Sequence, residues 1–307
     1  MVASGRHESG LVGFRLDNGK IPKLASRSRL TIRDRRSGLL VYRRKPDDES
    51  NKQKIFRLET QIVPLTRLDQ ACGRHFQYEL LSIERFGHET ALQAFHLHGV
   101  KSIYLSGRLL VRNYEEFLDK GFQMTTLLPD PYYAMAVRIF LFRKMATSNF
   151  SFLSERDKLL LGPISAHFSE VDINSTAELR RALKILPKGA RNPLASPVTR
   201  QLVATHPEQK IGTGDLAAAI DLLSRFAVVG HDAELMSFQS SLAALLNLPV
   251  DHLVVPPPNS ILNDLAGQLR LLPIAEQILE EDLILNHYVL EAIKSAQRAV
   301  VPATEDV

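Results

Sequence analysis

The sequence predicts an α/β protein in which a parallel-sheet domain follows a small β-rich module. After Phe76, apolar segments of strand length alternate with longer segments of helical periodicity, which is the order expected of βαβ units. Before about residue 70, short alternating segments are separated by turn signals. We therefore expect two domains, residues 1–70 and residues 71–307.

The composition is that of a globular protein. The chain has 307 residues, of which 45% are hydrophobic and 23% are charged. No apolar run approaches the roughly 18 residues that a membrane span needs, and the first residues lack the apolar core of a signal peptide. These features favour a cytoplasmic location. The single cysteine, Cys72, excludes an intramolecular disulfide, and we expect it to be a small buried hydrophobic residue.

Positive charge is concentrated near the N-terminus. The net charge is +4, but residues 1–63 contain 15 Lys and Arg against 7 Asp and Glu. Such a segment could attract a polyanion, a phosphorylated lipid surface or an acidic subunit, or it could form solvated strand faces. No aromatic-interleaved basic motif and no zinc-finger spacing occurs, which argues against nucleic acid as the partner.

The β-rich module is predicted from alternating segments and turns. Asp17-Asn18-Gly19 is a strong turn signal, and Leu30 and Ile32 alternate with polar residues. We expect these segments to form a small antiparallel sheet. Its strands are predicted over residues 11–16, 29–33, 39–43 and 55–63. The sequence does not decide whether this sheet is a separate module or an extension of the main sheet.

The second domain is predicted in βα order. Asp130-Pro131 is a typical helix start, and the apolar stripe of the last segment is typical of a core-facing helix. Strands are expected over residues 76–83, 102–105, 122–128 and 226–229. Helices are expected over residues 91–97, 114–119, 215–225, 232–246 and 272–299, and from Pro131 onward.

One strand–helix junction suggests an anion site. The strand over residues 76–83 passes through Gly87 into a helix, so backbone N–H groups at the helix start are left without partners. Arg85 could add positive charge and Thr90 a hydroxyl group. An ordinary structural turn explains the same pattern equally well.

Four segments together resemble the carbohydrate sulfotransferase family. Leu81–Leu92, LSIERFGHETAL, resembles the degenerate P-loop of that family, and Phe122–Arg138 resembles its strand–Arg-Asp-Pro–helix segment. Ala217–Leu246 and Glu280–Tyr288 resemble its last strand and helices. The resemblance implies a sulfotransferase-type parallel sheet. It also implies sulfuryl transfer from 3′-phosphoadenosine-5′-phosphosulfate to a hydroxyl group of a carbohydrate or other anionic polymer.

The resemblance also suggests roles for particular residues. Sulfuryl transfer needs in-line positioning, cations near the developing charge and a base for the acceptor hydroxyl. Glu84 is a further candidate for that base. The cofactor-binding residues expected are Arg85, Phe86, Gly87, Thr90 and Arg138, and the catalytic residues expected are Glu89, His88 and Arg108.

Several positions depart from the family pattern. Arg85 replaces the P-loop lysine, Pro129 replaces the arginine before Asp-Pro, and Val137 replaces a helical serine. Both usual ligands of the 3′-phosphate are therefore missing, each worth about 1.5–3 kcal/mol as a charge-assisted hydrogen bond. Arg138 or Arg143 could compensate. Arg108 also takes the place of a histidine in the family's Gly-His pair.

Three functions remain open from the sequence. The first is the sulfotransferase itself, with the basic N-terminal module helping to hold an anionic polysaccharide. The second is a catalytically degenerate protein of the same fold that acts as a glycan-binding or assembly partner. The third is an enzyme that uses another phosphorylated donor. No metal site is expected, because His96 and His98 have no third ligand placed by spacing.

Overall fold

The computed structural model describes residues 17, 19–36, 40–46, 51–97, 99–187 and 190–300. The chain forms two compact units, residues 1–50 and residues 51–307, where the sequence suggested a boundary at residue 70. The strand expected over residues 11–16 and the histidine at position 98 lie outside the described residues. No helix within the described ranges combines the length and the apolarity that crossing a membrane requires.

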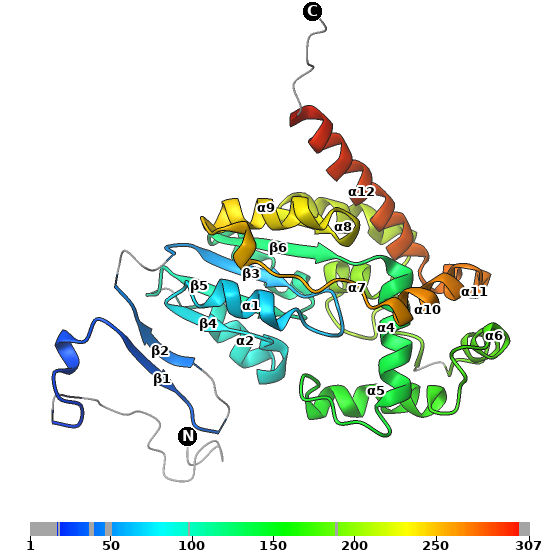
Figure 1. Cartoon of the computed structure of the whole chain (residues 1–307), viewed down its shortest axis with the longest axis horizontal. Helices are drawn as coiled ribbons and strands as arrows, with labels where there is room; N and C mark the ends of the chain where they lie inside the picture. Colours follow the sequence, from blue (N-terminus) through cyan, green and yellow to red (C-terminus); the bar gives the residue numbers. More distant parts are fainter. Residues whose placement is uncertain are drawn as a thin grey trace, which may run out of the picture. The chain divides into compact units, whose positions relative to one another are not determined.

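The first unit contains a two-stranded antiparallel sheet, as predicted. Strands β1 (Leu30–Arg33) and β2 (Leu40–Arg44) pair with Leu30 opposite Arg44, and the register shifts between Ile32 and Arg33 (Figure 1). A short 3-10 helix, Leu24–Ser26, precedes β1.

The second unit is built on a five-stranded sheet in the order β4-β5-β3-β6-β7 (Figure 1). Every neighbouring pair is parallel, which confirms the predicted α/β class with a parallel sheet. The strands are β3 (Lys54–Leu58), β4 (Tyr78–Leu80), β5 (Ile103–Gly107), β6 (Phe122–Leu128) and β7 (Val228–His231).

The central strand β3 corrects one sequence prediction. The alternating segment over residues 55–63 is predicted among the strands of the small antiparallel sheet. In the structure Ile55, Phe56, Arg57 and Leu58 are all buried, and β3 pairs with β5 on one side and β6 on the other. Ion pairs of Arg57 compensate its burial, so the charge does not mark a solvent-facing position.

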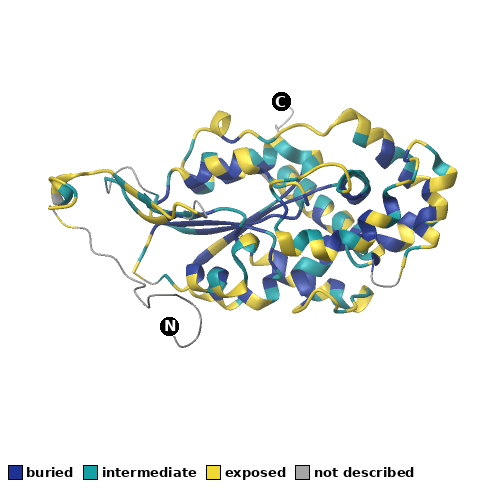
Figure 2. Cartoon of the chain, turned by 90° about the horizontal axis from the view of Figure 1, so that it is seen from below, coloured by how far each residue is buried: buried dark blue, intermediate teal, exposed yellow. Residues whose placement is uncertain are grey.

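Helices cover both faces of this sheet. On one face Ile55 and Tyr104 pack with side chains of α1 and α9, and on the other Phe56 contacts Phe95 of α2. Figure 2 shows the buried residues along the strands and the inner surfaces of the helices. The helices are α1 (Thr66–Gly73), α2 (His88–Phe95), α3 (Glu116–Asp119), α4 (Pro131–Lys144), α5 (Glu155–Phe168), α6 (Thr176–Lys184), α7 (Pro197–Val203), α8 (Leu216–Ser224), α9 (Leu235–Leu246), α10 (Ser260–Arg270), α11 (Pro273–Ile278) and α12 (Glu280–Val300).

A second core lies among helices beyond the sheet. Ile139 and Phe142 of α4 pack there with Phe168 of α5, Leu179 of α6 and Leu269 of α10. Helix α4 begins at Pro131 as predicted, with the Asp130 carboxylate accepting the Tyr133 N–H. This helical region therefore continues directly from the carboxyl end of β6.

Candidate functional site

The topology places the candidate site at the carboxyl ends of the central strands. Strand β3 comes first along the chain; β5 lies on one side of it and β6 on the other. Ligands of parallel α/β sheets bind outside the carboxyl ends of the strands, where successive connections leave in opposite directions. The segments that follow these three strands here begin at Glu59, Arg108 and Pro129.

In the loop after β3, the side chain of Glu59 accepts backbone N–H groups of the loop itself. Glu59 is 1% exposed, and its Oε2 accepts the Leu65 N–H at 2.7 Å. Its Oε1 accepts the Gln61 N–H at 3.0 Å. In phosphate-binding loops, backbone N–H groups between a strand and a helix hold an anion. In this loop the Glu59 carboxylate, a side chain of the protein itself, accepts two such N–H groups.

A buried charge network holds Glu59 in this position. Arg57 donates to Glu59 Oε2 at 2.7 Å and to the two carboxylate oxygens of Asp69 at 2.6 and 2.8 Å. The Tyr104 hydroxyl donates to Asp69 at 2.8 Å. Burial lowers the pKa of Arg57, but Asp69 and Glu59 together raise it well above the ordinary value. The guanidinium is therefore fully charged and committed to its two carboxylates.

Cys72 lies beside this network and has the predicted character. It is completely buried, and burial raises the pKa of its thiol to about 12, with the nearby Asp69 carboxylate adding to the rise. Since a cysteine nucleophile acts as the thiolate, this environment does not suit Cys72 for catalysis.

The loop predicted to bind the cofactor lies after β4, at the edge of the sheet. The strand–turn–helix order is as expected: β4 leads to the 3-10 helix Ile83–Phe86, then to Gly87 with φ 82°, then to α2. Arg85, His88 and Glu89 are exposed, and Phe86, Gly87 and Thr90 are half-buried. The His88 ring lies 2.7 Å from the Tyr114 hydroxyl. The roles expected for these residues stay predictions.

Arg108, predicted to be a catalytic cation, is held between two carboxylates. Its Nε donates to Glu84 at 3.1 Å, its backbone N–H donates to the same carboxylate at 3.1 Å, and its Nη2 donates to Asp157 at 3.2 Å. Burial raises the pKa of Glu84, while Arg108 opposes that rise. The carboxylate of Glu84, a candidate base from the sequence, is therefore already paired with Arg108. A Cβ on Gly107 would lie 2.8 Å from the Ile83 backbone nitrogen, so this turn requires glycine.

Arg138 lies inside α4 and is 8% exposed. It donates to the Pro193 carbonyl at 3.3 Å, and its Nε has no hydrogen-bond partner among the described residues. Burial lowers its pKa to about 10; Arg108 acts in the same direction, whereas Asp282 opposes it. The charge of Arg108 thus acts on Arg138, although Arg108 itself is already paired with Glu84 and Asp157.

A second polar cluster joins the ends of β6 and β7. The Asp130 N–H donates to Asp232 at 2.9 Å, and Arg270 pairs with Asp130 at 2.8 Å. Buried His231 lies 3.1 Å from Asp232 and 2.6 Å from the side-chain amide of Asn286 in α12. Burial lowers the pKa of His231 and raises that of Asp232. Asn286 comes from the last helix, so no local sequence signal marks it as a partner of His231.

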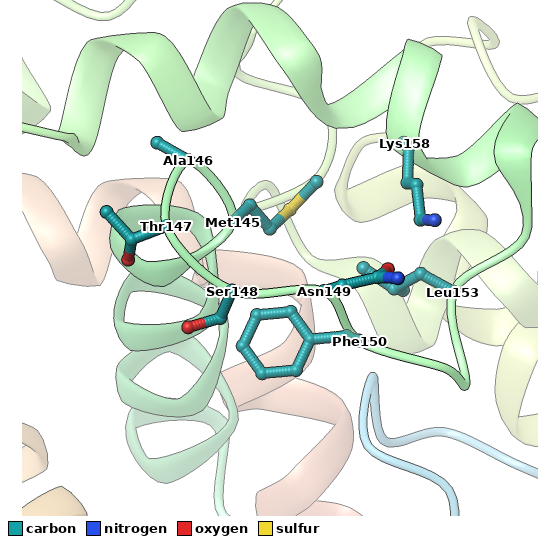
Figure 3. A pocket seen from close by; sticks show the side chains of 8 residues that line it. All are labelled: Met145, Ala146, Thr147, Ser148, Asn149, Phe150, Leu153 and Lys158. Atoms are coloured by element: carbon teal, nitrogen blue, oxygen red, sulfur yellow. The ribbon is translucent and has the colours of Figure 1, made fainter.

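The cavity at the turn from α4 to α5 offers little chemistry. It measures about 340 Å³, and Met145, Asn149 and Phe150 line it (Figure 3). Lys158 is the one ionisable side chain that lines it, and Lys158 pairs with Glu155 at 2.7 Å. Within the described residues no group of three His, Cys, Asp or Glu side chains could hold a metal ion.

Comparison with known proteins gives no relative for this chain. A scan against protein-family models found no match, and searches of curated proteins and of solved structures found none either. The resemblance to carbohydrate sulfotransferases thus rests on the sequence segments alone.

Proposed function

We propose that this chain is a catalytically degenerate protein of sulfotransferase-like fold that acts as a glycan-binding or assembly partner. The observation that carries the proposal is the Glu59 carboxylate in the loop after β3, bonded to the Leu65 and Gln61 N–H groups. A donor phosphate in this loop would have to displace a buried carboxylate and leave Arg57 with an unpaired side. Breaking such a buried pair costs about 3–5 kcal/mol.

Two further features support a closed donor site. Arg108 is neutralised by Glu84 and Asp157. Pro129 has no N–H and no charge to offer at the position where the family places an arginine. Of the cations expected near the transferring group, one is thus replaced by Pro129 and another, Arg108, is already paired.

The test is calorimetric titration with 3′-phosphoadenosine-5′-phosphate, the stable product of the family's donor. We expect no binding at millimolar nucleotide. Micromolar binding would overturn the proposal and favour an active donor site.

The second candidate is the sulfotransferase itself, with 3′-phosphoadenosine-5′-phosphosulfate bound at the loop after β4. One observation favours it: nothing lies within 4 Å of a Cβ placed on Gly87, and Arg85 beside it is exposed. Micromolar binding of the nucleotide that is lost in Arg85→Ala would support this candidate. Binding that persists in Arg85→Ala would place the nucleotide elsewhere.

A further inference from the structure

The amino-terminal edge of the sheet carries a row of lysines. Lys54 of β3 is in register with Ile103 of β5 and with Phe122 of β6. The Ile103 N–H donates to the Gln53 carbonyl at 2.9 Å, which extends the alignment before β3. A lysine stands two residues before each of these three aligned positions: Lys52, Lys101 and Lys120.

These lysines line one open cavity. Lys52, Lys54, Lys101 and Lys120 all border a hollow of about 490 Å³. Neighbouring strands lie about 4.8 Å apart, so the row spans roughly 10 Å across three strand ends. Like charges placed side by side across strands destabilise a sheet. Such a row is therefore better explained by a ligand than by the stability of the fold.

Most of these lysines have no acidic partner among the described residues. Lys52, Lys54 and Lys101 form no ion pair within the described part of the chain, and Lys52 and Lys101 are exposed. Lys120 pairs with Glu116 at 2.6 Å, and the nearby Asp119 pairs with Arg225 at 2.9 Å. Lys54 also lies 5.6 Å from the Phe122 ring. Three lysines that form no ion pair with any described residue thus line this hollow.

We propose that this lysine row binds an acidic polysaccharide, with the sulfate or carboxylate groups of successive sugar units against successive lysines. The choice of a saccharide rests on the proposed function, but the anion site itself does not. A row about 10 Å long suits a linear polymer better than a single small anion. Lysines act as point charges and need no bidentate geometry.

Single-stranded nucleic acid fits the row less well. Proteins that bind it add aromatic side chains on which bases stack. Phe122 is the one aromatic residue that lines the hollow, and it is 3% exposed. No base platform accompanies the charges in this hollow.

The test uses the full chain and a fluorescently labelled heparin-derived hexasaccharide. The test variant is Lys52→Gln/Lys54→Gln/Lys101→Gln, and the matched control is Lys158→Gln/Lys184→Gln/Lys294→Gln, which removes the same charge elsewhere in the second unit. We expect the dissociation constant to rise about tenfold or more in the test variant and less than about twofold in the control. The dependence of log affinity on log salt concentration becomes shallower in the test variant only.

Other outcomes overturn the proposal. Equal loss in both variants means general electrostatic attraction, and unchanged binding in the test variant places the polymer elsewhere. Tighter binding of oligothymidylate than of the hexasaccharide assigns the row to nucleic acid. Inorganic phosphate that competes at equal concentration reduces it to a single-anion site. If the triple variant does not fold, Lys52→Gln/Lys101→Gln replaces it, since both side chains are exposed.

Failure here and failure of the proposed function are distinguishable. Hexasaccharide binding at the lysines together with nucleotide binding overturns only the closed donor site. Absence of both leaves the donor site closed and removes the polysaccharide site.

Discussion

Basic residues lie at both ends of the central strands, but those at the carboxyl ends are paired and most of those at the amino ends are not. At the carboxyl edge, Arg57 and Arg108 are each held by two carboxylates. At the amino edge, Lys52 and Lys101 are exposed and have no ion pair among the described residues. Charge that is paired inside a fold stabilises a conformation, and charge that is left unpaired at its surface can attract a partner. Basic residues near an expected anion site therefore support that site only when the structure shows that no carboxylate already pairs with them.

The largest expected loss of stability comes from removing the ion pairs of Arg57 at the carboxyl ends of the strands. Arg57→Met leaves Glu59 and Asp69 as buried carboxylates without their cation. We expect a loss of about 3–5 kcal/mol in the free energy of unfolding, measured by urea denaturation. Arg67→Met, at an exposed position of α1, is the matched control and should change stability by less than about 0.5 kcal/mol. Equal effects of the two substitutions would show that the network does not stabilise the fold.

A smaller loss of stability is expected from a substitution at Gly107, which precedes Arg108 and lies close to Glu84. A Cβ added by Gly107→Ala meets Glu84 Oε2 at 2.3 Å as well as the Ile83 backbone. Overpacking of this kind costs about 1–3 kcal/mol, which thermal unfolding can measure. Gly267→Ala in α10 meets nothing within 4 Å and should stabilise slightly, because alanine favours a helix. A neutral Gly107→Ala would mean that the turn can relax and that the approach of Glu84 is not fixed.

His231 and Asp232, in the polar cluster at the ends of β6 and β7, should make the free energy of unfolding depend on pH. Burial lowers the pKa of His231 in the folded state, so the unfolded chain takes up a proton first. The contribution of His231 is complete above its unfolded pKa of about 6.5 and is lost as the pH falls below that value. Its slope cannot exceed about 1.4 kcal/mol per pH unit.

Asp232 acts in the opposite sense. Burial raises its pKa in the folded state, so the ionised carboxylate destabilises the fold at neutral pH. Protonation of Asp232 at acidic pH removes this destabilisation. The substitution His231→Asn removes the histidine contribution alone, so the stability measured by urea denaturation should fall less steeply below about pH 6.5. An unchanged curve would show that another group titrates there.

The smallest effect is expected at the unpaired edge. Lys52→Gln/Lys101→Gln removes two exposed side chains that form no described ion pair, so stability should change by less than about 0.5 kcal/mol. Circular-dichroism melting measures this change. A loss above about 1 kcal/mol would mean that these lysines stabilise the fold, which would remove the contrast between the two edges.

Local signals predicted much of the fold. β6 matches the expected segment, residues 122–128, and Asp130 caps α4 as its sequence suggested. The assignment of residues 55–63 to the small antiparallel sheet was wrong for β3, because the segment alternates in sequence although Ile55–Leu58, including the charged Arg57, are all buried. The local pattern of a strand cannot show that an ion pair will compensate a buried charge.

The partners at the candidate site could not be predicted in the same way. Arg108 meets carboxylates 24 and 49 residues away along the chain, and His231 meets Asn286 on the last helix. No periodicity or turn signal links such positions, since only the packing of the sheet and helices brings them together. The sequence located Arg85 and Glu89 on either side of the glycine that precedes a helix. It could not predict which side chains from other elements surround them.

The Glu59 loop also determines how the protein responds to its surroundings. A loop that needs a bound anion to satisfy its N–H groups is stabilised only when that ligand is present, so its melting temperature follows ligand concentration. Here the Glu59 carboxylate belongs to the chain itself and accepts the N–H groups of Gln61 and Leu65 without any small molecule. Removing that carboxylate would convert a self-sufficient fold into one whose stability depends on the anions in its solvent, and acetate or phosphate would then act as a chemical substitute for a side chain.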